Sequence, residues 1–389
     1  MSEWQETTLG NVVRLQRGHD LTEGERRPGK VPVIGSAGQN GWHDTAKAPG
    51  PGVTIGRSGA SAGVVTYVDR EYWPHNTSLY VTDFCGSEPR FIAYYLSTLR
   101  LAELNSGSAQ PSLNRNFLYN VPVLLPPQDE QRRIASILSA YDDLIEANRR
   151  RVAILEEMAR RLFEEWFVHL RFPGHATTPL HDTPDGPVPE GWSFMPLGRL
   201  VAEQRHAVSP TDLDVDTMYV GLEHLPRRST TLTDWGKARD VVSTKLRFHR
   251  GDVLFGKIRP YFHKVAVAPS SGVSSTDAIV LRSRASEHAG LVAAVASSDA
   301  FVAHAVQTSN GTKMPRANWN VLDKYPVRVP PALLLHQFNS VVVNSVQLAS
   351  SLAAANRRLA VARDLLLPRL LSGQLSVAQD QAPALLAAE

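Results

Sequence analysis

The sequence predicts an α+β protein of two similar mixed α/β domains separated by a long antiparallel two-helix coiled coil, with an internal pseudo-twofold repeat. Three observations lead to this fold class: a long heptad helix in the middle of the chain, a second such helix near its end, and a domain-sized segment before each helix that resembles the other. With 389 residues, of which 43% are hydrophobic, the chain is long enough for two or three packed cores.

The central helix is predicted to begin at Pro126-Pro127 and to reach about Phe167. Alternating steps of four and three residues give one narrow seam, the signature of a coiled coil: Ile134, Leu138, Tyr141, Ile145, Asn148, Val152, Leu155, Ala159, Leu162 and Trp166. Its exposed face offers three ion pairs in the favourable order: Glu146/Arg150, Glu156/Arg160 and Glu157/Arg161. At 1.5 Å per residue the helix would be roughly 60 Å long, which suits a spacer.

The segments before the two helices are related by an internal duplication. Trp4 and Leu9-Gly10 recur as Trp192 and Leu197-Gly198, an offset of 188 residues. Val53-Thr-Ile-Gly56-Arg57 aligns with Val253-Leu-Phe-Gly256-Lys257 at an offset of 200, and the proline pair before each helix recurs at 204. The offset grows along the chain, as expected if the loops of the second copy are longer.

A second helix is predicted from about Leu333 to Leu371, and its seam contains more alanine and serine than the first. Small residues allow two helix axes to approach closely, so the two helices are expected to pair antiparallel with one domain at each end. Asn148 and Asn356 would then lie close together and fix the register of the pair, a hypothesis motivated by their matched positions.

These features divide the chain into six predicted segments. The first domain covers 1–127, the spacer helix 128–172, a linker with five prolines and two glycines 173–190, the second domain 191–331, the C-terminal helix 332–375 and a flexible tail 376–389. Extended segments are expected at 31–34, 53–55, 64–68 and 79–81, with one helix near 90–104.

Composition limits the class of function. Cys85 is the only cysteine, which excludes a disulfide framework and a cysteine metal site, and the spacing of His169, His175 and His181 lacks the companions of a zinc site, so no metal is expected. No signal peptide opens the chain and no apolar run reaches 18 residues, so the sequence predicts a cytoplasmic protein without a membrane partner.

The sequence lacks the common catalytic motifs, and no catalytic residue is predicted. The phosphate loop of NTPases, the acidic-x-Lys part of a common nuclease site and the motifs of an amino-methyltransferase are all missing from the sequence. The glycine-rich run from Gly56 to Gly63 has no helical pattern behind it and reads as a turn between strands. The sequence therefore favours a protein that recognises a ligand over an enzyme.

Basic residues gather in the second domain, although the net charge is only +3. Ten cations occur between 227 and 264 against three aspartates, a local excess that suits a polyanion partner: Arg227, Arg228, Lys237, Arg239, Lys245, Arg247, Arg250, Lys257, Arg259 and Lys264. Arginine outnumbers lysine, which suits forked hydrogen bonds to phosphate and guanine, although a GC-rich genome would give the same bias.

Two polar loops recur where the copies align, and both carry residue types that read bases or phosphates. The first loop contributes Arg57 and Ser58 in copy one, and Lys257, Arg259, Tyr261 and Lys264 in copy two. The second contributes Gln110, Asn114 and Arg115, and then Asn310, Lys313 and Arg316. An ordinary solvated turn explains Arg57 equally well, whereas the aromatic residues beyond the second loop fit core anchors better than stacking platforms.

Taken together, these residues resemble the specificity (S) subunit of type I restriction-modification systems. The resemblance lies in two degenerate domains, each followed by Pro-Pro and a long helix, in the junction Pro126-Pro-Gln-Asp-Glu-Gln131, and in Arg161-Leu-Phe-Glu-Glu-Trp166-Phe and Leu367-Pro-Arg-Leu-Leu-Ser-Gly373. It covers essentially the whole chain. The second junction departs from the pattern, because it lacks the acidic pair of Asp129 and Glu130 and has two extra residues.

The resemblance implies two target recognition domains, each reading one half of a bipartite sequence in double-stranded DNA. It also implies that the helices dock two modification subunits, which bind S-adenosylmethionine and methylate adenine, and that two restriction subunits, which use ATP and Mg, can join. No cofactor is expected in this chain. Two major-groove readers on one face of DNA sit about 34–36 Å or a multiple apart, so helix length should set the unread spacer.

Two other classes of function stay open at this point. One is a DNA-acting enzyme, a nuclease or fused methylase, with an unrecognised active site, because scattered catalytic residues leave no motif. The other is an adaptor whose paired domains bind protein, for which binding would lack the steep salt dependence of a DNA complex.

Overall fold

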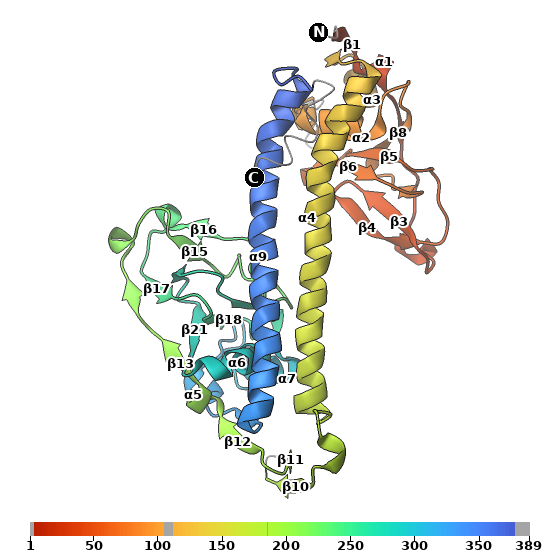
Figure 1. Ribbon diagram of the computed structural model, residues 1–389. Coiled ribbons are helices and arrows are strands. Elements are labelled where there is room, and N and C mark those ends of the chain that lie inside the picture. The colour runs from red at the N-terminus through yellow and green to blue at the C-terminus, as the bar shows by residue number, and fades with distance from the viewer. Residues whose placement is uncertain (1–3, 105–111, 185, 378–389) are drawn as a thin grey trace. The chain divides into compact units, whose positions relative to one another are not determined.

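The structure is a computed structural model that describes residues 4–104, 112–184 and 186–377. The chain forms two compact units: unit 1 comprises Met1–Asp143 and Leu359–Glu389, and unit 2 comprises Leu144–Arg358. The two long helices, α4 (Gln128–Phe163) and α9 (Ala332–Leu371), each contribute one part to each unit (Figure 1). Each unit is therefore one mixed domain together with its own segment of both helices.

Unit 1 is built on a four-stranded antiparallel sheet in the order β2-β8-β5-β6. These strands are β2 (Arg14–Arg17), β8 (Ser78–Asp83), β5 (Gly52–Gly56) and β6 (Val65–Val68), and α2 (Pro89–Thr98) follows β8. A smaller sheet contains β4 (Gly38–His43), β3 (Val31–Gly35) and β7 (Trp73–Pro74). The four predicted extended segments are confirmed as β3, β5, β6 and β8.

Unit 2 repeats the four-stranded sheet in the order β13-β21-β18-β19. Its strands and the helices after them are β13 (Val201–Gln204), β21 (Ala278–Ser283), β18 (Val253–Gly256), β19 (Val265–Val267), α6 (Ala289–Ser297) and α7 (Asp299–Gln307). Its second sheet is larger and has the order β14 (Ala207–Val208), β17 (Lys245–Phe248), β20 (Gly272–Ser274), β15 (Met218–Val220) and β16 (Gly236–Lys237).

The duplication extends to the register of a short ribbon that closes each domain. In unit 1, β1 (Gln5–Thr8) pairs with β9 (Pro122–Leu125), and in unit 2, β12 (Ser193–Pro196) pairs with β22 (Pro326–Val329). Each first strand leads into one helical turn, α1 (Leu9–Val12) or α5 (Leu197–Leu200), and each last strand follows a short helix, α3 (Arg115–Tyr119) or α8 (Trp319–Leu322). Each ribbon brings the start of its domain beside the chain that enters the long helix.

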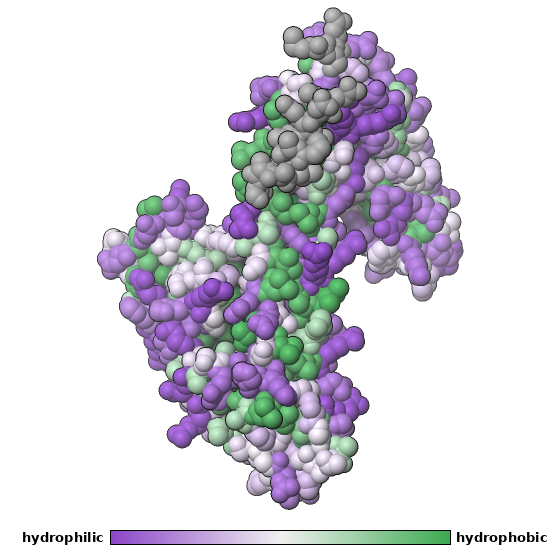
Figure 2. Space-filling view, in the orientation of Figure 1, coloured by the Kyte–Doolittle hydropathy of each residue, from purple (hydrophilic) through white to green (hydrophobic). Residues whose placement is uncertain are grey.

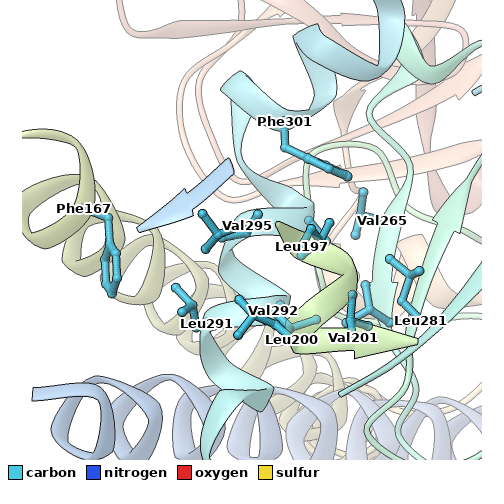
Figure 3. Packing of buried hydrophobic residues seen from close by; sticks show 14 of the residues in the cluster. Phe167, Leu197, Leu200, Val201, Val265, Leu281, Leu291, Val292, Val295 and Phe301 are labelled. Atoms are coloured by element: carbon cyan, nitrogen blue, oxygen red, sulfur yellow. The ribbon is translucent and has the colours of Figure 1, made fainter. Parts of the chain in front are cut away.

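The predicted seam of α4 is buried where it meets the domains. In unit 1, Ile134, Leu138 and Tyr141 are buried in one core with the nearby α2 residues Phe91 and Leu96. After Phe163 the helix widens into a π-helical turn, Glu164–Val168, which places Phe167 in the core of unit 2 (Figure 3). The helix thus reaches the end that the sequence predicts, but its last turn is π-helical.

Within unit 2 the two helix segments run antiparallel. Asn148 contacts Asn356, whereas Trp166, further along α4, packs on Phe338, which is earlier in α9. The start of α9 is longer than that of α4 by about one helical turn, not by the two residues that the sequence predicts: Gln131 accepts the Glu88 N–H at the start of α2, and Asn339 accepts the Gly290 N–H at the start of α6. A full extra turn keeps the same helix face toward the domain.

The segment predicted to be a linker is more ordered than expected. The strands β10 (Leu180–Thr183) and β11 (Gly186–Pro189) pair antiparallel, and Val188 is buried in the same core of unit 2 as Phe172 and Trp192. Prolines are tolerated there because an isolated hairpin leaves the outer N–H of each strand without a ladder partner. Composition alone therefore gave the wrong structure for this segment.

Candidate DNA interface

The two loops predicted separately in the first copy lie side by side in unit 1. Arg57 follows β5 directly, its N–H donates to Thr77 O (2.9 Å), and its carbonyl accepts the Leu113 N–H (2.8 Å). Ser58 forms a β-bridge with Ser112, in the described end of the second loop. Gln110 lies outside the described residues. The backbone thus joins the two candidate loops into one edge at the end of β5.

Asn114 and Arg115 begin α3 just beyond this edge. The Asn114 side-chain oxygen caps the helix by accepting the Asn116 N–H (3.0 Å), so that oxygen already has a structural partner. Among the described residues, the exposed Arg115 donates one long hydrogen bond, to Leu15 O (3.4 Å). Of these two residues, Arg115 keeps more of its hydrogen-bonding capacity for a ligand.

Unit 2 forms the same edge with the equivalent hydrogen bonds. Lys257 follows β18, its N–H donates to Asp277 O (3.0 Å), and its carbonyl accepts the Ala317 N–H (2.9 Å). Ile258 forms a bridge with Arg316, the counterpart of the Ser58–Ser112 bridge. Because neither loop is part of the regular sheets, their identical pairing in both units is a separate sign of duplication.

The second loop of unit 2 is closed on itself. Asn310 and Arg316 exchange both backbone hydrogen bonds, at 3.1 and 2.9 Å, with Lys313 at the exposed turn between them. Arg316 therefore lies between Ile258 on one side and Asn310 on the other. Arg259 adopts a left-handed backbone conformation (φ 49°) and donates its N–H to Pro315 O, while the Tyr261 side chain is 52% exposed.

Several cations of the predicted basic region have partners within unit 2. The Lys264 ammonium donates to Leu222 O, and burial, aided by the charge of Arg227, lowers the pKa of Lys264. Lys257 Nζ donates to Thr276 O. The other paired cations are Arg228 with Asp299, Lys237 and Arg239 with Asp216, and Lys245 with Ser243. A structural role therefore fits Lys264 better than DNA contact, and the exposed Lys313 and Arg316 are the stronger candidates.

One neighbour of the unit 1 edge was missed in the sequence. The turn between β3 and β4 reaches the Arg57 loop, where the Ser36 N–H donates to Thr77 Oγ1 (3.2 Å). Beyond this turn, Gln39 is exposed and Trp42 is 50% exposed. A lone tryptophan in a glycine-rich stretch gives no periodic signal, so only the fold shows that this hairpin adjoins the candidate edge.

The two asparagines predicted to meet between the helices do so. Asn148 is buried and donates from Nδ2 to Asn356 Oδ1 (2.9 Å), and Asn356 donates from its own Nδ2 to Ile145 O (3.1 Å). Pairing the buried Asn148 amide with that of the half-buried Asn356 satisfies a group that would be costly to leave without a partner. The structure brings the pair together, and its role in fixing the register stays a prediction.

Metal-binding groups and long apolar helices were also compared with the described part of the chain. Within residues 4–104, 112–184 and 186–377, no group of three His, Cys, Asp or Glu side chains could hold a metal ion. In the same ranges no single helix is long and apolar enough to cross a membrane; α6 and α7 together meet that test but are bent by 60° and belong to the core of unit 2. A groove of about 820 Å³ runs between α9 and α6, away from the loops.

Each of the two similar domains presents a pair of polar loops that are joined by backbone hydrogen bonds. Residues 1–157 match the family model described as type I restriction modification DNA specificity domain. The chain is 23% identical over 315 residues to the type I restriction enzyme MjaIX specificity subunit of Methanocaldococcus jannaschii, covering 75% of this chain and 70% of that one. It is 21% identical over 363 residues to the EcoDI specificity subunit of Escherichia coli, covering 86% and 79%.

The fold agrees with these sequence matches. The crystal structure of a type I restriction-modification S subunit from M. genitalium superimposes with a TM-score of 0.64 at 15% identity, covering 95% of this chain and 96% of the other. The family model, the curated relatives and the fold all support a specificity subunit of a type I restriction-modification system, as the sequence pattern predicts. Such subunits are non-catalytic, which agrees with the missing catalytic motifs.

Proposed function

We propose that the domains within 1–127 and 191–331 are target recognition domains, and that each reads one half of a bipartite DNA sequence with its joined loop pair. The observation that carries this proposal is the recurrence of the loop pairing, with Arg57 bonded to Leu113 in one unit and Lys257 bonded to Ala317 in the other. Two domains that recognise different half-sites need the same backbone arrangement to position their loops and different side chains to contact different bases.

The side chains on the two edges suit different parts of DNA. In unit 2, Arg316 and Lys313 can bind guanine edges or phosphates, and the exposed Tyr261 can pack on a base or sugar. In unit 1, Arg57, Ser58 and Arg115 lie along the edge, next to the hairpin that carries Gln39. Amide side chains match adenine, so Gln39 extends the range of bases that this half could read.

We further propose that the helices act as a ruler between the two half-sites and as a platform for other subunits. Hydrophobic residues are exposed along both helices and appear as green surface in Figure 2; in unit 2 these are Leu144, Ile154, Met158, Leu333, Val341 and Leu348. Exposed apolar side chains repeated along a helix are typical of a protein interface. Two modification subunits, and two restriction subunits in a complete complex, are the partners expected there.

In this proposal the chemistry belongs to the partners, which bind S-adenosylmethionine, ATP and Mg, and the complex acts on DNA in the cytoplasm. The proposal is tested by purifying the modification subunits with and without this chain and measuring methyl transfer to DNA. Methylation is expected only when the chain is present. Equal methylation without the chain would contradict the proposal.

The two alternative functions predict different outcomes of the same preparation. Methyl transfer or DNA cleavage by the isolated chain would favour an enzyme with an unrecognised active site. An adaptor for proteins would show DNA binding that is weak and almost independent of salt, whereas a reader that neutralises several phosphates loses affinity steeply as salt rises.

A further inference from the structure

One carboxylate of α4 makes contacts that its sequence neighbours do not. Glu156 was predicted to pair with Arg160, but Arg160 binds Glu157 and Glu164 instead. Glu156 Oε1 turns toward the loop before the recognition edge of unit 2. There it accepts the Ser229 hydroxyl (2.7 Å), the Thr230 N–H (2.8 Å) and hydroxyl (3.3 Å), and the Thr231 N–H (2.8 Å) and hydroxyl (2.7 Å).

A second contact holds the same loop from the other helix. Arg357 of α9 forms an ion pair with Asp234 (3.2 Å), and its guanidinium lies 3.8 Å from the centre of the Trp235 ring. Arg357 directly follows Asn356 of the buried amide pair. The loop 229–235 is thus held by one charged residue from each helix, and both contacts lie entirely within unit 2.

The held loop is connected by its backbone to the recognition edge. The Val267 N–H donates to Thr230 O (2.9 Å), and the Arg228 N–H donates to His263 O (2.9 Å). Arg227 also forms a bridge with Lys264. These bonds lay the segment 227–231 beside β19 and beside the end of the loop that carries Arg259 and Tyr261.

We propose that Glu156 and Arg357 form a clasp on the loop 229–235 that fixes the recognition domain of unit 2 on the helix pair and thereby determines which DNA spacer length the complex accepts. The helices can set the distance between the two recognition domains only if each domain is held rigidly on them. Glu156 accepts from the buried Thr231 and from the half-buried Ser229 and Thr230, and it is held rigidly because displacing it would leave these donors unsatisfied. The clasp residues are positioning residues with no contact to DNA, and the inference rests on the proposed function.

The arrangement in unit 1 differs, which makes the clasp specific to one domain. There α4 is bound through α2, with the Tyr94 hydroxyl donating to Asp142 and Arg90 paired with Asp143. In unit 2 the equivalent helix α6 packs on α9 in the same way, and the loop 229–235 adds a second attachment through a few polar groups from both helices. Loss of Glu156 or Arg357 should therefore loosen the second attachment of unit 2 while the packing of α6 on α9 keeps the domain folded.

The test uses the complex of this chain with its modification subunits. Its substrates are duplexes that carry the motif methylated in cells with the wild-type chain, with the native spacer or with one base pair added or removed. The wild type should strongly prefer the native spacer. For Glu156→Ala and Arg357→Ala that preference should fall by about fivefold or more, while the bases required in each half-site stay the same.

Matched controls separate positioning from general damage. Glu157→Ala and Arg358→Ala remove a neighbouring charge of the same sign from the same helices and should keep the wild-type spacer preference. Glu156→Gln retains an acceptor oxygen and should restore most of it. If Glu156→Ala does not fold, as judged by its melting temperature, Arg357→Ala carries the test, because its ion pair is exposed and its loss is tolerated.

Two results would overturn the proposal, and they differ in what else they overturn. A folded Glu156→Ala or Arg357→Ala complex that discriminates spacers as sharply as the wild type, or that loses activity equally on all spacers, contradicts the clasp alone. A wild-type complex that is indifferent to spacer length contradicts the ruler, and the clasp with it.

Discussion

The two units share a four-stranded sheet and a pair of joined loops, but they differ in their second sheet. The four-stranded sheets have the same strand order, and the loop pair after β5 is hydrogen-bonded like the loop pair after β18. The second sheets, in contrast, have three strands in unit 1 and five in unit 2. The comparison indicates that duplication preserved the sheet and the loop pairing that position the candidate DNA interface, whereas the second sheet of each unit diverged.

The largest expected difference between the units concerns the glycine that ends each central strand. A Cβ at Gly56 would lie 2.1 Å from Ser61 O and 2.4 Å from Ser36 O, both backbone atoms that cannot move aside. At Gly256 the nearest atoms are Lys264 Cβ (3.1 Å) and Lys264 O (3.2 Å). Gly56→Ala should therefore lower the free energy of unfolding by about 3 kcal/mol, and Gly256→Ala by about 1 kcal/mol.

Denaturant unfolding of the two variants, followed by tryptophan fluorescence, measures this difference. The paired substitution is its own control, because both positions follow the same strand of the repeat. Equal losses of stability would show that the β3–β4 turn does not press on the Arg57 loop as the structure indicates.

A smaller and more specific effect is expected from the exposed cations. Arg57→Ala in unit 1 and Arg316→Ala in unit 2 should each reduce methylation of the native target. For a side chain that contacts a base, the expected loss of DNA-binding free energy is about 1–3 kcal/mol. Each variant should relax the base preference in one half of the target, and the two variants should affect different halves. Methylation rates on duplexes with single base changes in each half measure this.

Lys264→Ala serves as the contrast, because its ammonium is bound to Leu222 O inside unit 2. We expect it to reduce stability without relaxing either half-site. Relaxation of both halves by a single cation variant would contradict the division of labour between the units.

The smallest expected effect is at the helix pair. The units use different chemistry there: Asp142 pairs with Arg363 in unit 1, and the neutral Asn148 pairs with Asn356 in unit 2. Asn148→Leu leaves Asn356 Oδ1 without that donor and should destabilise the protein by about 1 kcal/mol or less, with altered helix register or assembly. Thermal unfolding and subunit titration test this. Greater stability with unchanged register and assembly would contradict the register role.

Much of the fold could be predicted because its signals are periodic or repeated. The seam from Ile134 to Trp166 has a heptad spacing that core packing requires, and the glycine and proline positions of the repeat fix turns and helix starts. The pairing of β10 with β11 could not be predicted in this way, because the prolines and glycines of this segment read as a linker, and the strand pairing and the burial of Val188 in the core of unit 2 are seen only in the fold.

The two candidate loops could be located from the sequence, but the contacts of their side chains could not. Residue types indicated the two loops, and the fold joined them, but the sequence could not show that the Asn114 oxygen caps a helix or that Lys264 is bound inside unit 2. Glu156 has an arginine four residues on, a spacing that predicts a surface ion pair, and its true partners lie more than seventy residues away. Local rules cannot anticipate such long-range partners.

The measurement that tests the account most directly is the mapping of N6-methyladenine in cells after residues 191–331 are replaced by the corresponding domain of another family member. Cells with the wild-type chain should methylate one bipartite motif that is absent when the chain is deleted. The chimera should change one half of that motif and retain the other half and the spacer. A change in both halves, or an unchanged motif, would contradict the claim that each unit reads one half-site.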